Sequence, residues 1–307
     1  MWSLARQQTV SEEPVKWGIV FSSTGFPDAD AAIALAQTAE EVGFESLWAP
    51  EHVVMSRAPD ATPYRGVANG KMDRLARRGG IPDPLAWLAF VAAATTTIRL
   101  GTNVLILPQH QPVVLAKTAS TIDHLSKGRL MLGIGVGELP EEYEACGMDF
   151  TNRGKRMDEY IEAMRLLWRE DIATFHGTYV RFNQMECRPW PVNRAIPLHV
   201  GGSSDAAIRR AARVGDGYFP FVFPHEDIRV ALPALIGRVK RAAKEFGRDP
   251  EALEITSGGA KTVEDAKWYA SVGVHRIGVA VKASTVPDIR DELRRFGDEV
   301  IAHTRDL

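Results

Sequence analysis

Cysteine is scarce in this chain of 307 residues, which contains only Cys146 and Cys187. The two thiols form no CxxC pair and cannot build the disulfide framework of a small secreted protein. No stretch reaches the roughly 18 apolar residues of a membrane span, and the N-terminal residues lack the apolar core of a signal peptide. These absences predict a protein of the reducing cytoplasm that has no membrane partner.

The chain also lacks an excess of charge of either sign. It has 37 basic and 39 acidic residues, and the formal net charge is −2. A chain without a basic excess offers nucleic acid or an anionic membrane no broad electrostatic footprint. We therefore expect a small molecule as the partner. Hydrophobic residues make up 45% of the chain, which is enough for a core and argues against general disorder.

Short apolar runs alternate along the chain with amphipathic segments of helical period, which is the pattern of βαβ units in a parallel sheet. Strands are predicted at 16–21, 45–50, 97–107, 129–137, 196–202, 215–221, 252–257 and 274–281. Helices are predicted at 28–43, 84–95, 112–126, 153–169 and 287–303. Eight alternations without a linker predict one (β/α)₈ TIM barrel over residues 15–307, after a polar N-terminal arm of residues 1–14.

Two insertions interrupt the alternation, one after the second strand and one between the fourth and fifth strands. The first, Val53 to Pro82, has a charge excess of +4 from Arg57, Arg65, Lys71, Arg74, Arg77 and Arg78 against Asp60 and Asp73. We interpret it as a basic lid on the catalytic rim, with a solvated loop as the alternative. In the second, two stretches of period two around His176-Gly177 predict a β-hairpin.

A glycine-rich junction joins the fifth predicted strand to the next helix. Gly201, Gly202, Ser203 and Ser204 stand there, followed by DAAIRRAARV. Such a junction presents unpaired N–H groups and the positive end of a helix dipole, which together favour a phosphate. The alternative is a tight turn in which a serine or Asp205 caps the helix without a ligand.

A second group of glycines, Gly133, Gly135 and Gly137, ends the fourth predicted strand. The spacing is GxGxG and not the GxGxxG of a dinucleotide fold, so we interpret these small residues as room for a flat ring at the barrel mouth. Glu138 follows at the rim, where a carboxylate can exchange a proton or hold a substrate. A charge at a helix N-terminus is the alternative.

One histidine is a candidate, with a purely structural role as the alternative, because His52 follows Glu51 at the end of the second predicted strand. A histidine on the rim can move protons near neutral pH. His199 falls within a strand and is interpreted as part of the barrel interior. The histidines show no metal-binding spacing, so we predict no metal site. No hydrolase motif is present, which weakens a hydrolase interpretation. No lysine stands out at a strand end.

Three segments, ESLWAPEHVV (45–54), the stretch 98–138 and IPLHVGGSSDAAIRRAARVGDGY (196–218), resemble the luciferase-like monooxygenase superfamily. The resemblance is strongest to its actinobacterial branch dependent on coenzyme F420, an 8-hydroxy-5-deazaflavin. It implies a (β/α)₈ barrel with insertions, F420 as the cofactor and a homodimer. FMN, which has a similar ring and a ribityl phosphate, is the alternative cofactor.

The resemblance also implies roles for individual residues. His52 matches a histidine beside the deazaflavin ring, and Glu138 matches an acidic residue at the reaction centre of sugar-phosphate dehydrogenases in this superfamily. Asn103-Val104 matches a bulge behind the ring that is frequently built on a non-prolyl cis peptide. Gly201, Gly202, Ser203 and Ser204 match the phosphate loop. Two positions depart from the pattern: Glu51 replaces an aspartate, and Glu141 replaces an amide residue.

These features together predict an oxidoreductase that transfers a hydride between the deazaflavin and an organic substrate. One rival is an FMN-dependent monooxygenase that uses oxygen, and another is a flavin-binding protein without turnover. A phosphate-binding aldolase or isomerase is a third rival, for which a lysine at a strand end would be expected. The sequence does not identify the substrate.

Overall fold

The computed structural model of the protein describes residues 14–26, 28–56, 58, 62, 80–283 and 285–307. The strands are β1 (Lys16–Val20), β2 (Ser46–Ala49), β3 (Arg99–Thr102), β4 (Leu105–Ile106), β5 (Leu130–Gly135), β6 (Ala173–His176), β7 (Arg181–Met185), β8 (Leu198–Gly201), β9 (Gly217–Phe219), β10 (Glu254–Gly258) and β11 (Arg276–Val279). The α-helices are α1 (Ser22–Gly25), α2 (Ala29–Val42), α4 (Pro84–Ala93), α5 (Pro112–Leu125), α6 (Pro140–Ala145), α7 (Arg153–Arg169), α8 (Asp205–Val214), α9 (Ile228–Glu245), α10 (Val263–Ser271) and α11 (Val286–Glu299).

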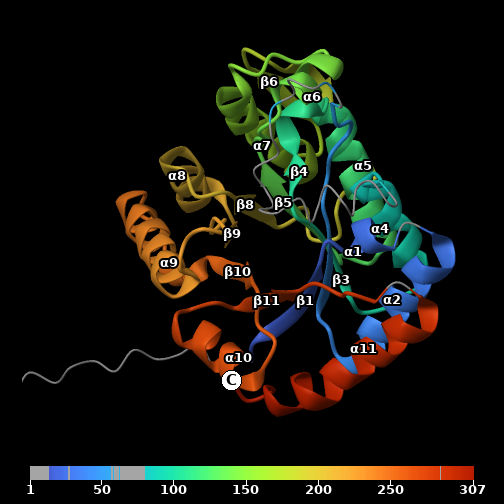
Figure 1. The fold of residues 1–307 in the computed structure, drawn as a ribbon. Coiled ribbons are helices and arrows are strands. Elements are labelled where there is room, and N and C mark those ends of the chain that lie inside the picture. Colours follow the sequence, from blue (N-terminus) through green and yellow to red (C-terminus); the bar gives the residue numbers. More distant parts are fainter. Residues whose placement is uncertain (1–13, 27, 57, 59–61, 63–79, 284) are drawn as a thin grey trace, which may run out of the picture.

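The described strands close into a parallel barrel in the order β1, β2, β3 with β4, β5, β8, β9, β10 and β11, and β11 pairs with β1. The helices surround this barrel, and α11 lies beside α2, so the two ends of the barrel domain meet (Figure 1). The predicted (β/α)₈ barrel is confirmed. The polar arm predicted for residues 1–14 lies outside the described residues except for Pro14.

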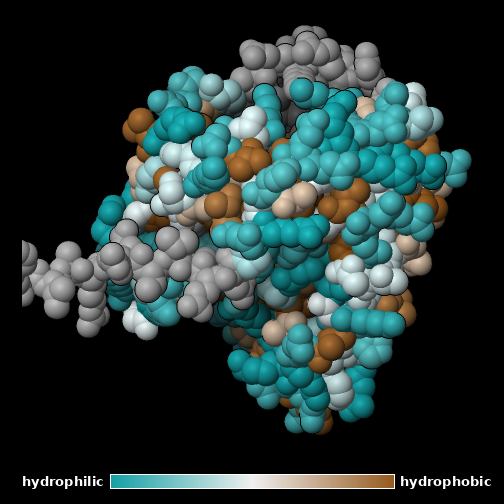
Figure 2. Space-filling model, turned by 90° about the horizontal axis from the view of Figure 1, so that it is seen from below, coloured by the Kyte–Doolittle hydropathy of each residue, from teal (hydrophilic) through white to brown (hydrophobic). Residues whose placement is uncertain are grey.

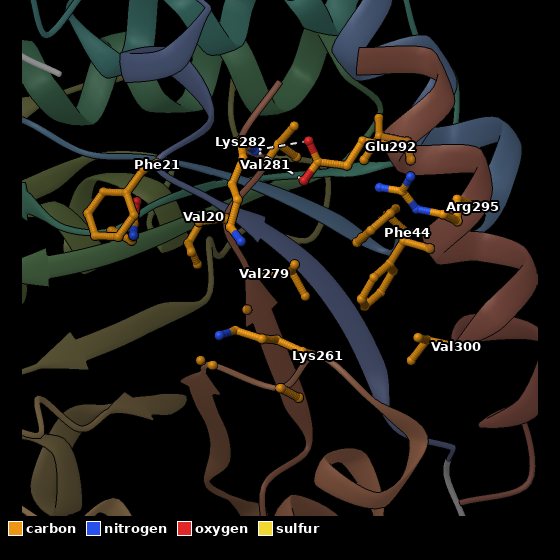
Figure 3. Close-up of a pocket in the computed structure, with 18 of the residues that line it drawn as sticks. Val20, Phe21, Phe44, Lys261, Val279, Val281, Lys282, Glu292, Arg295 and Val300 are labelled. Atoms are coloured by element: carbon orange, nitrogen blue, oxygen red, sulfur yellow. Dashed lines mark hydrogen bonds between the residues drawn. The ribbon is translucent and has the colours of Figure 1, made fainter. Parts of the chain in front are cut away.

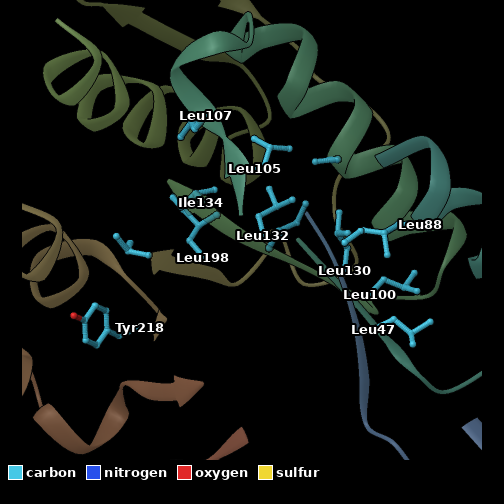
Figure 4. Packing of buried hydrophobic residues seen from close by; sticks show 14 of the residues in the cluster. Leu47, Leu88, Leu100, Leu105, Leu107, Leu130, Leu132, Ile134, Leu198 and Tyr218 are labelled. Carbon is cyan, nitrogen blue, oxygen red and sulfur yellow. The ribbon is translucent and has the colours of Figure 1, made fainter. Parts of the chain in front are cut away.

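The core lies between the barrel wall and the helices, because strand side chains that face outward meet the apolar faces of the helices. Leu47, Leu100, Leu130 and Leu198 come from four different barrel strands and are all buried (Figure 4). Helix ends follow local sequence signals. Gly43, for example, ends α2 with a φ of 97°, a left-handed conformation that glycine adopts without steric cost.

The predicted insertion between the fourth and fifth barrel strands is present as a departure from the simple alternation. The segment between β5 and β8 contains α6, α7 and the antiparallel hairpin of β6 and β7, so the predicted hairpin is confirmed. The predicted helix at 153–169 coincides with α7. The short helix α1, which packs against β2, was not predicted. Most of the insertion from Val53 to Pro82 lies outside the described residues, including all six basic residues of the predicted lid.

The amino-terminal end of the barrel interior is filled by a charged network around Arg276. Its guanidinium group is fully buried and donates hydrogen bonds to the carboxylates of Glu45 and Glu254 at 2.7–3.1 Å. A buried charge is tolerated when it is paired in this way. The guanidinium carbon lies 5.3 Å from the ring centre of Trp48, which fills the barrel at the next level.

His199 is part of this interior, as predicted, and its side chain is only 1% exposed. Burial first, and then the nearby charge of Arg276, lower the pKa of His199 to about 3. The imidazole is therefore neutral in the folded protein at neutral pH. Its Nε2 atom lies 3.4 Å from a carboxylate oxygen of Glu254, where a neutral ring can donate a hydrogen bond.

Figure 2 shows one face of the outer surface, coloured by hydropathy. Hydrophilic residues cover most of that face, and hydrophobic residues are scattered among them. In the described part of the chain, no helix combines the length and the apolar character required to cross a membrane.

The packing of Trp48 leads to a stability prediction for Gly101. A Cβ atom at Gly101 would lie 2.5 Å from Trp48 Cε3, and the fully buried indole has no room to move. We expect Gly101→Ala to lower the free energy of unfolding by about 1–3 kcal/mol, measured by urea denaturation. Gly154→Ala is the matched control. Its Cβ atom would meet Arg210 at an ordinary 3.6 Å, and alanine favours the helix, so this variant should be neutral or more stable.

The low pKa of His199 predicts a loss of stability as the pH falls. The unfolded chain binds a proton at His199 near the ordinary pKa of 6.5, whereas the folded protein does so only near 3. Stability should therefore decrease below pH 6.5, by up to roughly 1.4 kcal/mol per pH unit. Between pH 6.5 and 5 the decrease should be smaller in His199→Gln. Equal slopes for wild type and variant would show that His199 does not cause the loss.

Candidate active site

The segment between β3 and β4 is a bulge at the carboxyl end of the barrel. Gly101 pairs with Met131 and Leu105 with Ile134, so the segment from β3 to β4 has one residue more than the facing part of β5. The peptide bond between Asn103 and Val104 is cis, as the resemblance implied. The bulge thus interrupts the barrel wall on the side of β5 and β8.

The Val104 side chain occupies the space beside two glycines at the strand ends. A Cβ atom would lie 2.6 Å from Val104 at Gly135 and 2.9 Å from it at Gly201. At Gly133 it would clash with the carbonyl oxygen of Thr102. The expectation that Gly133 and Gly135 leave room for a flat ring is therefore wrong, since atoms of the bulge fill that room. A ligand at the mouth would meet Val104 instead.

The loop of Gly201, Gly202, Ser203 and Ser204 lies next to this bulge and leads into α8. Gly202 has a φ of 118°, donates its N–H to Phe219 O at 3.1 Å and accepts a hydrogen bond from the Tyr218 hydroxyl at 2.8 Å. The Ser204 hydroxyl caps α8 by accepting from Ala207 N. The cap considered as an alternative is thus present, and the first N–H groups of α8 still have no partner within the helix.

His52 is held by a carboxylate that the sequence analysis did not single out. Its Nδ1 atom lies 3.1 Å from Glu142 Oε2, and the second oxygen of Glu142 accepts from Val53 N at 2.6 Å. Both side chains are nearly buried, at 8% and 1% exposure. Glu142 therefore fixes both the ring of His52 and the backbone that follows it. Its neighbour Glu141 accepts two hydrogen bonds from Thr62.

Glu51, which replaces the expected aspartate, contacts Ile106 and His110. Its buried carboxylate accepts a hydrogen bond from Ile106 N, just after the bulge, and lies 2.9 Å from His110 Nε2. Burial disfavours the charged form of His110, but the hydrogen bond and the charge of Glu51 outweigh it and raise the pKa of His110. Glu51 thus connects β2 to the end of the bulge.

Glu138 lies two residues before α6 and is partly exposed. The preceding Gly137 has a φ of 64°, and a Cβ atom there would lie 2.8 Å from Ile106. The turn at Gly137 leads directly to the helix that holds His52. The structure therefore gathers His52, Glu138 and Glu142 at the carboxyl ends of β2 and β5.

Several buried polar atoms at this end of the barrel have no hydrogen-bond partner within the described chain. They are Asn103 Oδ1 and the hydroxyls of Ser22, Ser23 and Thr24. Unpaired buried polar groups are costly and suggest a partner outside the chain. The polar edge of a flavin-type ring offers such partners. These atoms, Val104 and the phosphate loop therefore fit a cofactor of that type.

Other candidates differ from the expectations. Lys261 and Lys282 each stand three residues after a barrel strand, β10 and β11, although the sequence analysis saw no lysine at a strand end. Lys282 directly follows the predicted strand 274–281, and Lys261 lies four residues after the predicted strand 252–257, so the sequence analysis overlooked both lysines. Among the described residues, no group of three or more His, Cys, Asp and Glu side chains is arranged to hold a metal ion.

A parallel barrel with ionisable and hydrogen-bonding groups at the carboxyl ends of its strands defines an α/β-barrel enzyme. The luciferase-like monooxygenase family matches residues 2–280, and the chain belongs to this family. It is therefore a luciferase-like oxidoreductase or monooxygenase.

Individual relatives agree with this assignment. An uncharacterized protein of Mycobacterium tuberculosis is 33% identical over 279 residues, which cover 88% of this chain and 94% of the relative. An F420-dependent glucose-6-phosphate dehydrogenase of Kineococcus radiotolerans is 30% identical, over 94% of this chain and 81% of the relative. The solved structure of an F420-dependent secondary alcohol dehydrogenase has the same fold, with a TM-score of 0.74 at 17% identity, over 94% of this chain and 99% of that one.

Proposed function

We propose that this protein is an F420-dependent oxidoreductase that transfers a hydride to or from an organic substrate. The observation that carries the proposal is a set of buried polar atoms at the carboxyl end of the barrel, Asn103 Oδ1 in the bulge and three hydroxyls of α1, which lack partners within the described chain. A relative at 30% identity is named as F420-dependent, which supports the deazaflavin over other ring cofactors.

In this proposal the chain holds the cofactor at two points. Asn103 and Val104 support the ring from behind, where Val104 fills the space between Gly135 and Gly201. The loop of Gly201, Gly202, Ser203 and Ser204 receives the phosphate at the start of α8. There the first N–H groups of α8, which have no partner within the helix, and the helix dipole favour an anion, whereas the Gly202 N–H is already bound to Phe219 O. Gly137 shapes the turn that brings Glu138 to the rim.

The bound deazaflavin supplies a two-electron hydride donor or acceptor. The protein supplies orientation and proton handling. The buried carboxylate of Glu142 accepts a hydrogen bond from His52 Nδ1 and orients the imidazole, which exchanges a proton with the substrate. Glu138, on the same rim, is the second proton-exchanging group. Hence Glu142 is a positioning residue, and His52 and Glu138 are the proposed catalytic residues.

An FMN-dependent monooxygenase is the second candidate, favoured by the monooxygenase description of the matched family. The same residues would hold a flavin ring and its single phosphate. The visible absorption of the purified protein separates the two cofactors, and a flavin-binding protein without turnover would bind one of them but show no activity.

The proposal also includes a cytoplasmic homodimer. The cytoplasmic location is supported by Cys146 and Cys187, which are both free thiols in the structure. The homodimer follows from the resemblance, and sedimentation of the purified protein tests it.

A change at the phosphate loop should weaken cofactor binding through charge. Ser203→Asp places a negative charge where the phosphate is proposed to bind. Ser203→Asn introduces a side chain of nearly the same shape as aspartate but without the charge. We expect Ser203→Asp to raise the Kd for F420 by about tenfold or more, and Ser203→Asn to change it little. Fluorescence titration of F420 measures both. If the two variants bind F420 with equal affinity, the phosphate does not bind at this loop.

Catalysis should depend on His52 more than on the residue that holds it. His52→Ala should lower kcat by about 10²–10⁴ if the ring exchanges a proton with substrate. Glu142→Gln keeps an oxygen for Val53 N and should cause a smaller loss. Absorbance of F420, with glucose 6-phosphate and secondary alcohols as test substrates, gives the rates. A His52→Ala enzyme with unchanged kcat would assign the proton transfer elsewhere.

A further inference from the structure

A cavity of about 640 Å³ opens between the carboxyl ends of β1, β10 and β11 and helix α11. Val20, Phe21, Val279 and Val281 give it apolar walls. Glycines at the ends of β10 and β11, Gly258 and Gly278, also line it and leave it open at the strand ends. Because ligands of α/β barrels bind at this end of the strands, the cavity is in the position of a binding site.

The cavity borders the residues that are proposed to hold the cofactor ring. Asn103, whose buried Oδ1 has no partner within the described chain, forms part of its wall. Phe219 forms another part, and the carbonyl of Phe219 accepts the N–H of Gly202 in the phosphate loop. A molecule in the cavity would therefore lie beside a ring bound at the bulge.

Five ionisable residues line the cavity: Lys261, Lys282 and Arg295 are basic, and Glu292 and Glu299 are acidic. In Figure 3 the side chains of Lys261 and Lys282 extend into it from the loops after β10 and β11. Neither ammonium group has an ion pair or hydrogen bond with any residue that the structure describes. By contrast, Lys16, Lys240 and Lys267 elsewhere on the protein are paired with carboxylates.

Two acidic residues of α11, Glu292 and Glu299, line the cavity, and Glu292 is already engaged with the backbone. The carboxylate of Glu292 accepts hydrogen bonds from the backbone N–H groups of Lys282 and Ala283 at 2.7–3.1 Å, as the dashed lines in Figure 3 show in part. It therefore holds the loop after β11 and does not neutralise the ammonium groups by direct contact. The three basic residues of the lining exceed the two acidic ones by one, and the two lysine side chains lie beside an apolar wall.

We propose that this cavity binds the substrate, and that the substrate is an organic acid with an apolar body. A carboxylate or phosphate group pairs with Lys261 and Lys282, and the apolar part lies along Val20, Phe21 and Val279. This inference rests on the proposed hydride transfer, because the cavity borders the ring site of that proposal. It names the substrate class that the sequence left open.

Matched small molecules test the charge and the apolar wall separately. The probes are phenylacetate, its neutral analogue phenylacetamide, phenyl phosphate and acetate, measured by ligand-observed NMR with the full chain. Phenylacetate or phenyl phosphate should bind about three- to tenfold more tightly than phenylacetamide, as expected for two lysines that are exposed in the structure, and the difference should shrink in high salt. The stronger of the two acids identifies the acid group. Acetate should bind more weakly than phenylacetate because it lacks the apolar body.

Variants assign the preference to this cavity. The double variant Lys261→Met and Lys282→Met should lose the preference for the acid and keep its affinity for phenylacetamide. Lys155→Met removes an exposed lysine of α7, which does not line the cavity, and should behave as wild type. The proposal is overturned if wild type shows no preference for either acid, or if the double variant keeps it.

A titration with F420 separates this proposal from the proposed function. F420 also carries anionic groups, so the double variant should bind F420 with unchanged affinity if the lysines serve the substrate. If its affinity for F420 falls as much as that for the acid, the lysines bind the cofactor and the substrate proposal is wrong. If wild type does not bind F420 but still prefers the acid through these lysines, the proposed cofactor fails while the acid site stands.

Discussion

The bulk of one side chain, Trp48, determines which part of the barrel interior is filled by the protein and which part can hold a ligand. Its buried indole is accommodated only because Gly18 and Gly101 lack Cβ atoms, which would lie within 3 Å of it. Below it, Arg276 and its two carboxylates fill the amino-terminal end of the barrel. The interior is thus packed up to the level of Trp48, and only the carboxyl end remains for a ligand.

At that end, buried carboxylates hold the segments that carry chemistry. Glu142 fixes His52 and Val53, while Glu51 joins the end of β2 to Ile106 just beyond the bulge. Each of these acids binds a backbone N–H as well as a histidine, so loss of either would free a loop and a side chain together. Rim residues can then keep a defined geometry although they lie outside regular strands.

The barrel and much of its rim could be predicted from the sequence. Periodicity placed the strands and the helix at 153–169, and a glycine signal ended α2 at Gly43. The resemblance, not the residue pattern, supplied the cis bond at Asn103-Val104, whereas both indicated His52, whose catalytic role stays a proposal. The pattern failed at α1, whose four residues are too few to show a helical period.

The sequence by itself determined the alternation of strands and helices, because hydrophobic periodicity is a local property. Only the tertiary structure decided which side chains meet. Glu142 is 90 residues from its partner His52, and Glu51 is 59 from His110. Lys261 and Lys282 face one cavity because neighbouring parallel strands end at the same edge of the barrel. Such contacts depend on strand register and side-chain direction, which no local pattern encodes.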